Sequence, residues 1–243
     1  KYKPIIIVAG EPNSIFLEIF FKTQKKKIKS PLILIASHKL LKLQMKKLNY
    51  KKKINILNYN KLSDYNLNNK SINLIDVTYN VSKAFEKISI KSNSYIENSF
   101  KIAFKILKSG ITNKFINGPI SKKTFLKKNY LGVTEYISEK FSIKNSAMLI
   151  YNKKLSVCPV TTHVPLKLVT KRIDKKNIFN KIKLIINFYK KNLKLNPKIA
   201  VLGMNPHCES VDNFNEDEKI IRPLVIKMKS LGHRISGPHS ADT

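Results

Sequence analysis

Short runs of β-branched and other apolar residues alternate along this chain with longer segments whose apolar positions recur at helical spacing. In the segment 175–193, Ile178, Ile182, Ile186 and Tyr189 share one helical face, which predicts a helix that packs against a core. The same reasoning predicts helices at residues 14–22, 38–48, 93–109, 121–128, 134–141, 175–193 and 215–231. It predicts strands at residues 4–9, 32–36, 54–57, 72–77, 114–117, 147–151, 155–160, 199–202 and 234–236.

This alternation of strands and helices predicts an α/β fold with largely parallel sheets covered by helices on both faces. Gly110 and Gly232 stand where helices are expected to end. The Asn-rich stretch 58–73 is the best candidate for a surface excursion. A chain of 243 residues, 42% of them hydrophobic, has room for one large domain or two small ones with a substantial core.

The formal net charge of +32 raises the question of a nucleic-acid partner. Arginine occurs only at positions 172, 222 and 234 among the 47 basic residues, and base and phosphate recognition draws on the bidentate fork of arginine. The lysines are scattered, and the abundance of Lys, Asn and Ile is what an A/T-rich genome encodes. We therefore favour codon bias over nucleic-acid binding, and expect only a weak, non-specific attraction of anionic substrates.

Cysteine content and hydropathy indicate the compartment. The two cysteines, Cys158 and Cys208, form no disulfide framework, which predicts a reducing, cytoplasmic location. Apolar runs fall well short of the ~20 residues that span a bilayer, so we expect no membrane partner. The chain begins without methionine and stops in a polar strand-to-turn segment, 237–243, and we expect more protein to follow in the natural product.

Two histidines stand in matching settings, His163 in Thr-Thr-His-Val-Pro-Leu and His207 in Gly-Met-Asn-Pro-His. Each follows an apolar run, 155–160 or 199–202, that predicts a buried strand, and open α/β sheets bind ligands where strands end. Two such turns can place both imidazoles around one metal ion, although each histidine can also be an ordinary turn residue. Cys208 is adjacent to His207, and adjacent ligands strain a tetrahedral site, so we favour a passive thiol.

Other polar residues lie at the start of predicted helices. Residues 10–14 (Gly-Glu-Pro-Asn-Ser) can form an anion-binding turn but lack the G-x-G-x-x-G spacing. In residues 117–122, Ser121 can cap a helix and Lys122 can meet a phosphate or carboxylate, or remain a solvated lysine. Thr134 is a plausible N-cap whose hydroxyl can bind phosphate. Asp242 can accept a proton or a substrate hydrogen bond, or be a simple turn aspartate.

Taken together, these segments resemble the 4-hydroxythreonine-4-phosphate dehydrogenase family of vitamin B6 biosynthesis. Six motifs occur in the order of that family, over essentially the whole chain: Gly-Glu-Pro (10–12), Asn-Gly-Pro-Ile-Ser-Lys (117–122), Gly-Val-Thr-Glu (132–135), Thr-Thr-His-Val-Pro-Leu (161–166), Asn-Pro-His (205–207) and Gly-Pro-x-x-Ala-Asp-Thr (237–243). The resemblance implies a two-lobed fold similar to isocitrate and isopropylmalate dehydrogenases, with a cleft between lobes at 1–130 and 131–243, working as a homodimer.

The resemblance also implies a reaction and a site. Members of the family oxidise 4-phosphooxy-L-threonine with NAD or NADP, and loss of CO2 gives 3-amino-2-oxopropyl phosphate. A divalent metal (zinc, cobalt or magnesium) is held by three histidines, of which His163 and His207 match two and the partner subunit supplies the third. Thr134 matches a substrate-contacting threonine, Asp242 matches a cleft aspartate that we take as catalytic, and Lys122 is a candidate substrate contact. The third histidine would lie beyond residue 243, so we expect this chain alone to be inactive.

Departures from the family pattern leave alternatives open. Val133 stands where the family has a substrate-binding histidine, and Ser14, Phe16 and Leu17 replace residues of a motif that is usually richer in glycine. One alternative is a threonate or erythronate 4-phosphate dehydrogenase of the same family. Another is a catalytically silent paralogue that binds a phosphorylated ligand or a partner.

Overall fold

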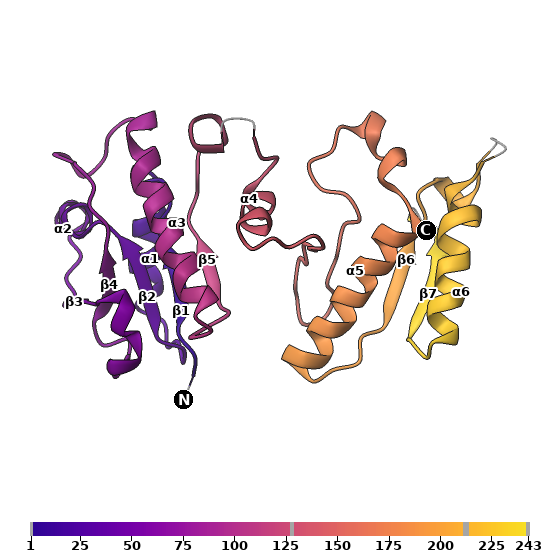
Figure 1. Cartoon of the computed structure of the whole chain (residues 1–243), viewed down its shortest axis with the longest axis horizontal. Coiled ribbons are helices and arrows are strands. Elements are labelled where there is room, and N and C mark those ends of the chain that lie inside the picture. Colours follow the sequence, from indigo (N-terminus) through magenta and orange to yellow (C-terminus); the bar gives the residue numbers. More distant parts are fainter. Residues whose placement is uncertain (1, 127–128, 211–213, 242–243) are drawn as a thin grey trace. The chain divides into compact units, whose positions relative to one another are not determined.

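The computed structural model describes residues 2–126, 129–210 and 214–241 of the chain. The chain divides into two compact units, Lys1–Leu131 and Gly132–Thr243 (Figure 1). Within the described ranges, no helix combines the length and the apolar character needed to cross a bilayer.

The first unit is built on a parallel sheet of five strands. The strands are β1 (Ile5–Val8), β2 (Leu32–Ala36), β3 (Ile54–Ile56), β4 (Ile72–Asp76) and β5 (Phe115–Asn117), in the spatial order β3-β4-β2-β1-β5. Helices α1 (Phe16–Thr23), α2 (His38–Lys47) and α3 (Asn93–Lys108) return the chain between strands, together with shorter turns at Tyr59–Asp64 and Ile90–Ser92. A further turn, Lys122–Leu126, follows β5. This confirms the expected α/β class with a mostly parallel sheet and flanking helices.

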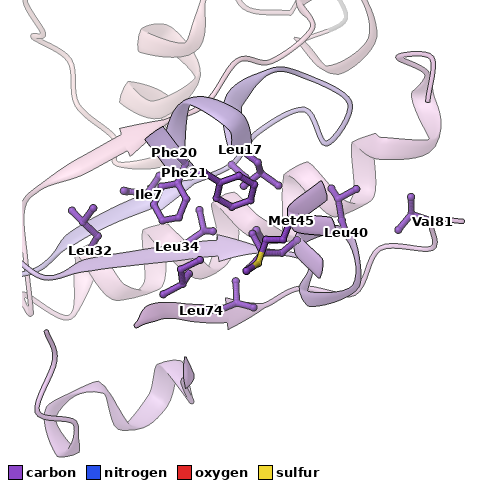
Figure 2. Close-up of a cluster of buried hydrophobic side chains, with 14 residues drawn as sticks. Ile7, Leu17, Phe20, Phe21, Leu32, Leu34, Leu40, Met45, Leu74 and Val81 are labelled. Carbon is purple, nitrogen blue, oxygen red and sulfur yellow. The ribbon is translucent and has the colours of Figure 1, made fainter. Parts of the chain in front are cut away.

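The core of the first unit follows from the alternation of side chains along each strand. On one face, Ile7, Leu34 and Leu74 pack against side chains of α1 and α2 (Figure 2). The intervening residues, such as Ile6 and Ile33, are fully buried on the opposite face, where α3 packs against β1 and β2. Each fully buried aliphatic side chain stabilises the fold by roughly 1.5–3 kcal/mol, so this double-sided sheet is the main source of stability in the unit.

The second unit has a smaller sheet and a smaller core. Strands β6 (Ile199–Leu202) and β7 (Ile235–His239) pair in parallel, with an irregular register. Helix α5 (Lys175–Phe188), extended by a π-type turn at Tyr189–Leu193, and helix α6 (Arg222–Ser230), preceded by a similar turn at Asp217–Ile221, bury one apolar face each. Helix α4 (Val133–Lys140) and short 3₁₀ turns at Leu166–Leu168, Thr170–Arg172 and Pro206–Cys208 complete the described elements.

Most predicted elements are confirmed to within a few residues, and β2 and β6 have the expected bounds. Gly110 and Gly232 follow α3 and α6 with φ of +77° and +79°, the left-handed conformation expected after a helix. The single helix expected at 215–231 is instead a π-type turn followed by α6. The helix expected at 121–128 is a five-residue turn, Lys122–Leu126, and positions 127–128 lie outside the described residues.

Two predicted strands, 147–151 and 155–160, are wrong. The only strand-like pairing there is one antiparallel bridge between Ile150 and Val157, and Leu155 is 74% exposed. Hydrogen bonds between Asn152 and Ser156 close a tight turn between the two apolar runs, and neither run pairs with the β6–β7 sheet. The run before His163 is therefore a surface hairpin and not a buried strand.

The Asn-rich stretch 58–73 is also more than the surface excursion that we expected. Asn73 lies inside β4, and its amide donates to the carbonyl oxygens of Leu32 and Asn68. Asn69 accepts from the Leu32 N–H and donates to two carbonyls of the preceding loop. These amides satisfy backbone groups at the start of β2, which is a structural role that composition alone does not reveal.

Candidate active site

Two glycine turns meet at the carboxyl edge of the five-stranded sheet. Strands β1 and β5 are neighbours, so the turns that follow them, at Gly10 and Gly118, lie against each other. The Glu11 N–H donates to the Pro119 carbonyl at 2.7 Å, and a Cβ on either glycine would collide with the backbone of the other turn. Two motifs about a hundred residues apart in the sequence therefore form one surface, and they require glycine because backbone approaches backbone.

The 10–14 turn is less open to an anion than we expected. The Glu11 side chain is 3% exposed and accepts hydrogen bonds from the Ser92 hydroxyl at 2.9 Å and the Asn13 N–H at 3.3 Å. The Ser14 N–H donates to the Glu11 carbonyl, and the Phe16 N–H donates to the Ser14 hydroxyl. Because these N–H groups already have partners, the turn positions Glu11 rather than presenting a nest for phosphate.

The turn after β5, which carries Lys122, has nearby polar atoms without hydrogen-bond partners in the described part of the chain. The Ser121 hydroxyl accepts from the Thr124 N–H at 3.2 Å, as predicted for a cap, and the Lys122 side chain is exposed. Next to them, Thr124 Oγ1 and Asn93 Oδ1 are shielded from solvent and lack a hydrogen-bond partner among the described residues. Asn93 Nδ2 donates to the Thr124 carbonyl at 2.9 Å, so these atoms belong to one cluster. Lys122 is thus exposed on a turn whose cap is formed, and the two unpartnered atoms lie in the shielded contact between this turn and the start of α3.

A polar cleft of about 650 Å³ lies at the same edge of the first unit, after β4. It is lined by hydroxyl, amide and charged groups from the loop after β4 and from the starts of α2 and α3: Lys39, Thr78, Tyr79, Asn80, Val81, Ser82, Glu86, Lys91, Ser94 and Tyr95. Burial raises the pKa of Tyr79, and its hydroxyl is hydrogen-bonded to Asn13. Sequence reasoning missed this cleft, although the polar run after a predicted strand was a usable signal.

Thr134 lies at the start of α4, but it is not the N-cap that we expected. Gly132 is the N-cap, with an extended backbone and no side-chain hydrogen bond, and Val133 is the first helical residue. The prediction was wrong by two positions because a glycine needs no side chain to make the turn into the helix. The Thr134 side chain is exposed in the first turn, where backbone N–H groups have no intrahelical partners.

His163 lies beside the start of the same helix. A Cβ on Gly132 would stand 3.6 Å from His163 Cδ2 and 3.7 Å from His163 Nε2. The residue is exposed and has a φ of +56°, a left-handed backbone that is uncommon for a residue other than glycine. The structure thus brings one candidate metal ligand to the helix that carries a candidate substrate contact.

His207 lies in a second turn with the same backbone conformation. It follows β6 within the 3₁₀ turn Pro206–Cys208, is exposed, and has a φ of +54°. The fully buried carboxylate of Asp217 holds this turn by accepting from the N–H groups of Met204 at 2.8 Å and Asn205 at 3.0 Å. Sequence reasoning missed Asp217, since nothing in the chain marks a carboxylate that accepts from loop N–H groups 12 and 13 residues away.

The described residues do not assemble a metal centre by themselves. Within ranges 2–126, 129–210 and 214–241, no three side chains of His, Cys, Asp or Glu gather in a way that could hold an ion. Cys208 is buried, and neither cysteine forms a disulfide within the part of the chain that the structure describes. Asp242, the predicted catalytic residue, lies outside the described residues. The donor types fit a divalent metal at His163 and His207, but further donors are needed to complete a site.

The comparisons with known proteins agree on one family. The sequence model of the family described as "Pyridoxal phosphate biosynthetic protein PdxA" matches residues 27–243. A 4-hydroxythreonine-4-phosphate dehydrogenase from Sulfurihydrogenibium sp. is 33% identical over 98% of this chain and 74% of its own length. A D-threonate 4-phosphate dehydrogenase from Pectobacterium atrosepticum is 27% identical over 71% of this chain and 54% of its own length.

Solved structures agree on the fold. The crystal structure of a 4-hydroxythreonine-4-phosphate dehydrogenase from Klebsiella pneumoniae superposes with a TM-score of 0.83 at 22% identity, over all of this chain and 75% of the other. At that identity the likeness establishes the fold, and the family match over residues 27–243 establishes the relationship. This chain therefore belongs to the PdxA family of pyridoxal phosphate biosynthetic proteins.

Proposed function

We propose that this protein oxidises 4-phosphooxy-L-threonine with NAD or NADP and decarboxylates the product to 3-amino-2-oxopropyl phosphate, a step of pyridoxal phosphate biosynthesis. The observation that carries the proposal is the family match over residues 27–243, which spans the turns of Lys122, Thr134, His163 and His207. The 33% identity to a dehydrogenase named for this substrate supports the same assignment.

The proposal includes a divalent metal, zinc, cobalt or magnesium, held by His163 and His207. Two exposed imidazoles on left-handed turns support it, as does a solvent-shielded carboxylate oxygen of Glu135 near His163. When bound, the metal supplies Lewis-acid chemistry that lowers the pKa of an alcohol oxygen, and the nicotinamide supplies a hydride acceptor. The remaining protein donor would come from the partner subunit of a homodimer. Analytical ultracentrifugation of the purified protein tests whether it is a dimer.

The remaining residues bind and orient the substrate. We assign to Thr134 a hydrogen bond from its exposed hydroxyl to the phosphate or a hydroxyl of the substrate, next to the free N–H groups of the first turn of α4. Lys122, exposed beside two unpartnered polar atoms, would attract and bind an anionic group. Asp242 would accept a proton. We place this reaction in a reducing cytoplasm, on the low cysteine content of the sequence.

The test is turnover by the protein expressed from its natural gene and, in parallel, by the 243-residue chain. Formation of reduced nicotinamide is followed with 4-phosphooxy-L-threonine, with each metal and with NAD or NADP. His163→Ala and His207→Ala should abolish turnover, while His38→Ala, which removes an imidazole from the first unit, should leave it unchanged. Absence of turnover with this substrate and with D-threonate or D-erythronate 4-phosphate, with all metals and both cofactors, would favour a catalytically silent phosphate-binding paralogue.

A threonate or erythronate 4-phosphate dehydrogenase is the second candidate. Val133, the first residue of α4 and half-buried, stands where the family resemblance leads us to expect a histidine, and one relative is named a D-threonate 4-phosphate dehydrogenase. A higher kcat/KM for D-threonate 4-phosphate or D-erythronate 4-phosphate than for 4-phosphooxy-L-threonine would establish it. In that case Val133→His should shift the preference back towards 4-phosphooxy-L-threonine.

A further inference from the structure

Glu135, the third residue of α4, has an oxygen atom that the protein leaves unused. Its Oε2 is shielded from solvent and has no hydrogen-bond partner among the described residues. The side chain folds back towards the beginning of the helix, because Oε2 lies 3.0 Å from the point where a Gly132 Cβ would stand. A shielded carboxylate oxygen without a partner costs stability, so such an atom calls for an explanation.

The His163 imidazole lies against the same glycine. Its Cδ2 and Nε2 atoms are 3.6 Å and 3.7 Å from the same Gly132 point, so the ring and the carboxylate flank one residue that has no side chain. Glu135 Oε2 does not form a hydrogen bond with the ring in the structure. A side chain at position 132 would contact both groups, so Gly132 leaves open the space between the carboxylate and the ring.

The position of the Glu135 side chain also fits a helix-capping role. A glutamate three residues after an N-cap can reach back to the N-cap N–H, and its charge also favours the positive end of the helix. The structure shows no hydrogen bond of Oε2 to the Gly132 N–H. Glutamine serves equally well in such a cap, so replacing the carboxylate by an amide separates the two explanations.

We propose that Glu135 is a positioning residue for His163: its carboxylate accepts a hydrogen bond from one ring N–H and fixes the imidazole in the orientation that binds metal. The inference rests on the proposed role of His163 as a metal ligand. Histidine ligands commonly donate their second N–H to a carboxylate, and removal of that partner typically weakens metal binding by about 10–100-fold. An unsatisfied carboxylate oxygen beside the proposed metal ligand is the acceptor that such an arrangement requires.

The experiment measures Zn²⁺ affinity by competition with a chromophoric chelator, using the protein expressed from its natural gene. Glu135→Gln is compared with Glu139→Gln, which makes the same chemical change at an exposed carboxylate one turn later on α4. We expect Glu135→Gln to weaken Zn²⁺ binding by about 10–100-fold and Glu139→Gln to leave it within about twofold of the unsubstituted protein. The melting temperature of metal-free Glu135→Gln should equal or exceed that of the unsubstituted protein, whereas loss of a structural contact would lower it.

A second readout uses Co²⁺, whose visible absorption reports the geometry of its ligands. Glu135→Gln should change this spectrum, and Glu139→Gln should not. If His163→Ala weakens Zn²⁺ binding but Glu135→Gln does not, the positioning role is wrong and the metal role of His163 stands. If neither substitution weakens binding, or if the unsubstituted protein binds no Zn²⁺, the metal role of His163 fails and this inference fails with it.

Discussion

The two units of the chain differ in how deeply the residues of their strands are buried. All five residues of β2 are buried in the first unit, whereas β6 in the second alternates half-buried and exposed residues. Among the described residues, left-handed backbones other than glycine occur once in the first unit, at Asn49. In the second they occur at Ser142, His163, Lys194, His207 and Cys208. The first unit thus concentrates stability in a covered sheet, and the second holds its candidate chemistry in strained, exposed turns.

The largest expected effect comes from the core of the first unit. Leu34→Ala should lower the free energy of unfolding by about 4 kcal/mol, because Leu34 is fully buried in the central strand and its removal leaves a cavity. The matched substitution in the second unit, Leu202→Ala, should cost less than about 1 kcal/mol, because Leu202 is 57% exposed in β6. Urea unfolding with hydrogen exchange resolved by unit measures both, and equal losses would remove the contrast between the two sheets.

The second unit should depend instead on a buried polar contact. Asp217→Ala should cost about 3 kcal/mol, because it leaves the N–H groups of Met204 and Asn205 without their acceptor and removes one of the two acceptors of the Asn205 amide. The loss of protection in hydrogen exchange should be concentrated in residues 203–208 and α6. Asp174→Ala, which removes only the N-cap of α5, is the control and should cost about 1 kcal/mol. If the two losses are equal, Asp217 does no more than cap a helix.

The difference in strand burial between the two units also explains which strands could be predicted from the sequence. In the first unit the apolar runs of β2 and β4 coincide with predicted strands, because both faces of the sheet are covered there and these runs are buried. The apolar runs around Ile150 and Val157 carry the same signal but form an exposed hairpin, since a short turn pairs them locally. Hydropathy along the chain does not distinguish a run that joins a sheet from one that folds on its neighbour.

The candidate site shows the same division. Motif order was sufficient to single out His163, His207 and Thr134, and the structure places His163 at the helix that carries Thr134. Asp217 and Glu135 were missed because their significance depends on contacts made across the fold and not on their neighbours in the chain. Supporting side chains of this kind become visible only when burial and hydrogen bonding are known.

A buried titratable group distinguishes the first unit at high pH. Burial is the main cause that raises the pKa of Tyr95 above its usual value of 10, and its hydroxyl accepts a hydrogen bond from the Ser37 N–H. A raised pKa in the folded state means that the stabilisation is complete below pH 10 and is lost as the pH rises. We expect a loss of up to about 1.4 kcal/mol per pH unit above pH 10 in the first unit. Tyr95→Phe should flatten this dependence in denaturation profiles, and an unchanged slope would contradict it.

The smallest expected effect tests the strain in the second unit. At positions 163 and 207, φ is +56° and +54°. The variant with glycine at either position should have a free energy of unfolding roughly 1 kcal/mol higher than the variant with alanine, because only glycine adopts this conformation without a steric cost. At His233, which is not among the residues with positive φ, the order should reverse, since glycine there only adds entropy to the unfolded chain. Urea denaturation of the three Gly/Ala pairs measures the difference. If alanine is the more stable at His163 and His207 as well, these turns store no strain, and their exposure alone separates the second unit from the first.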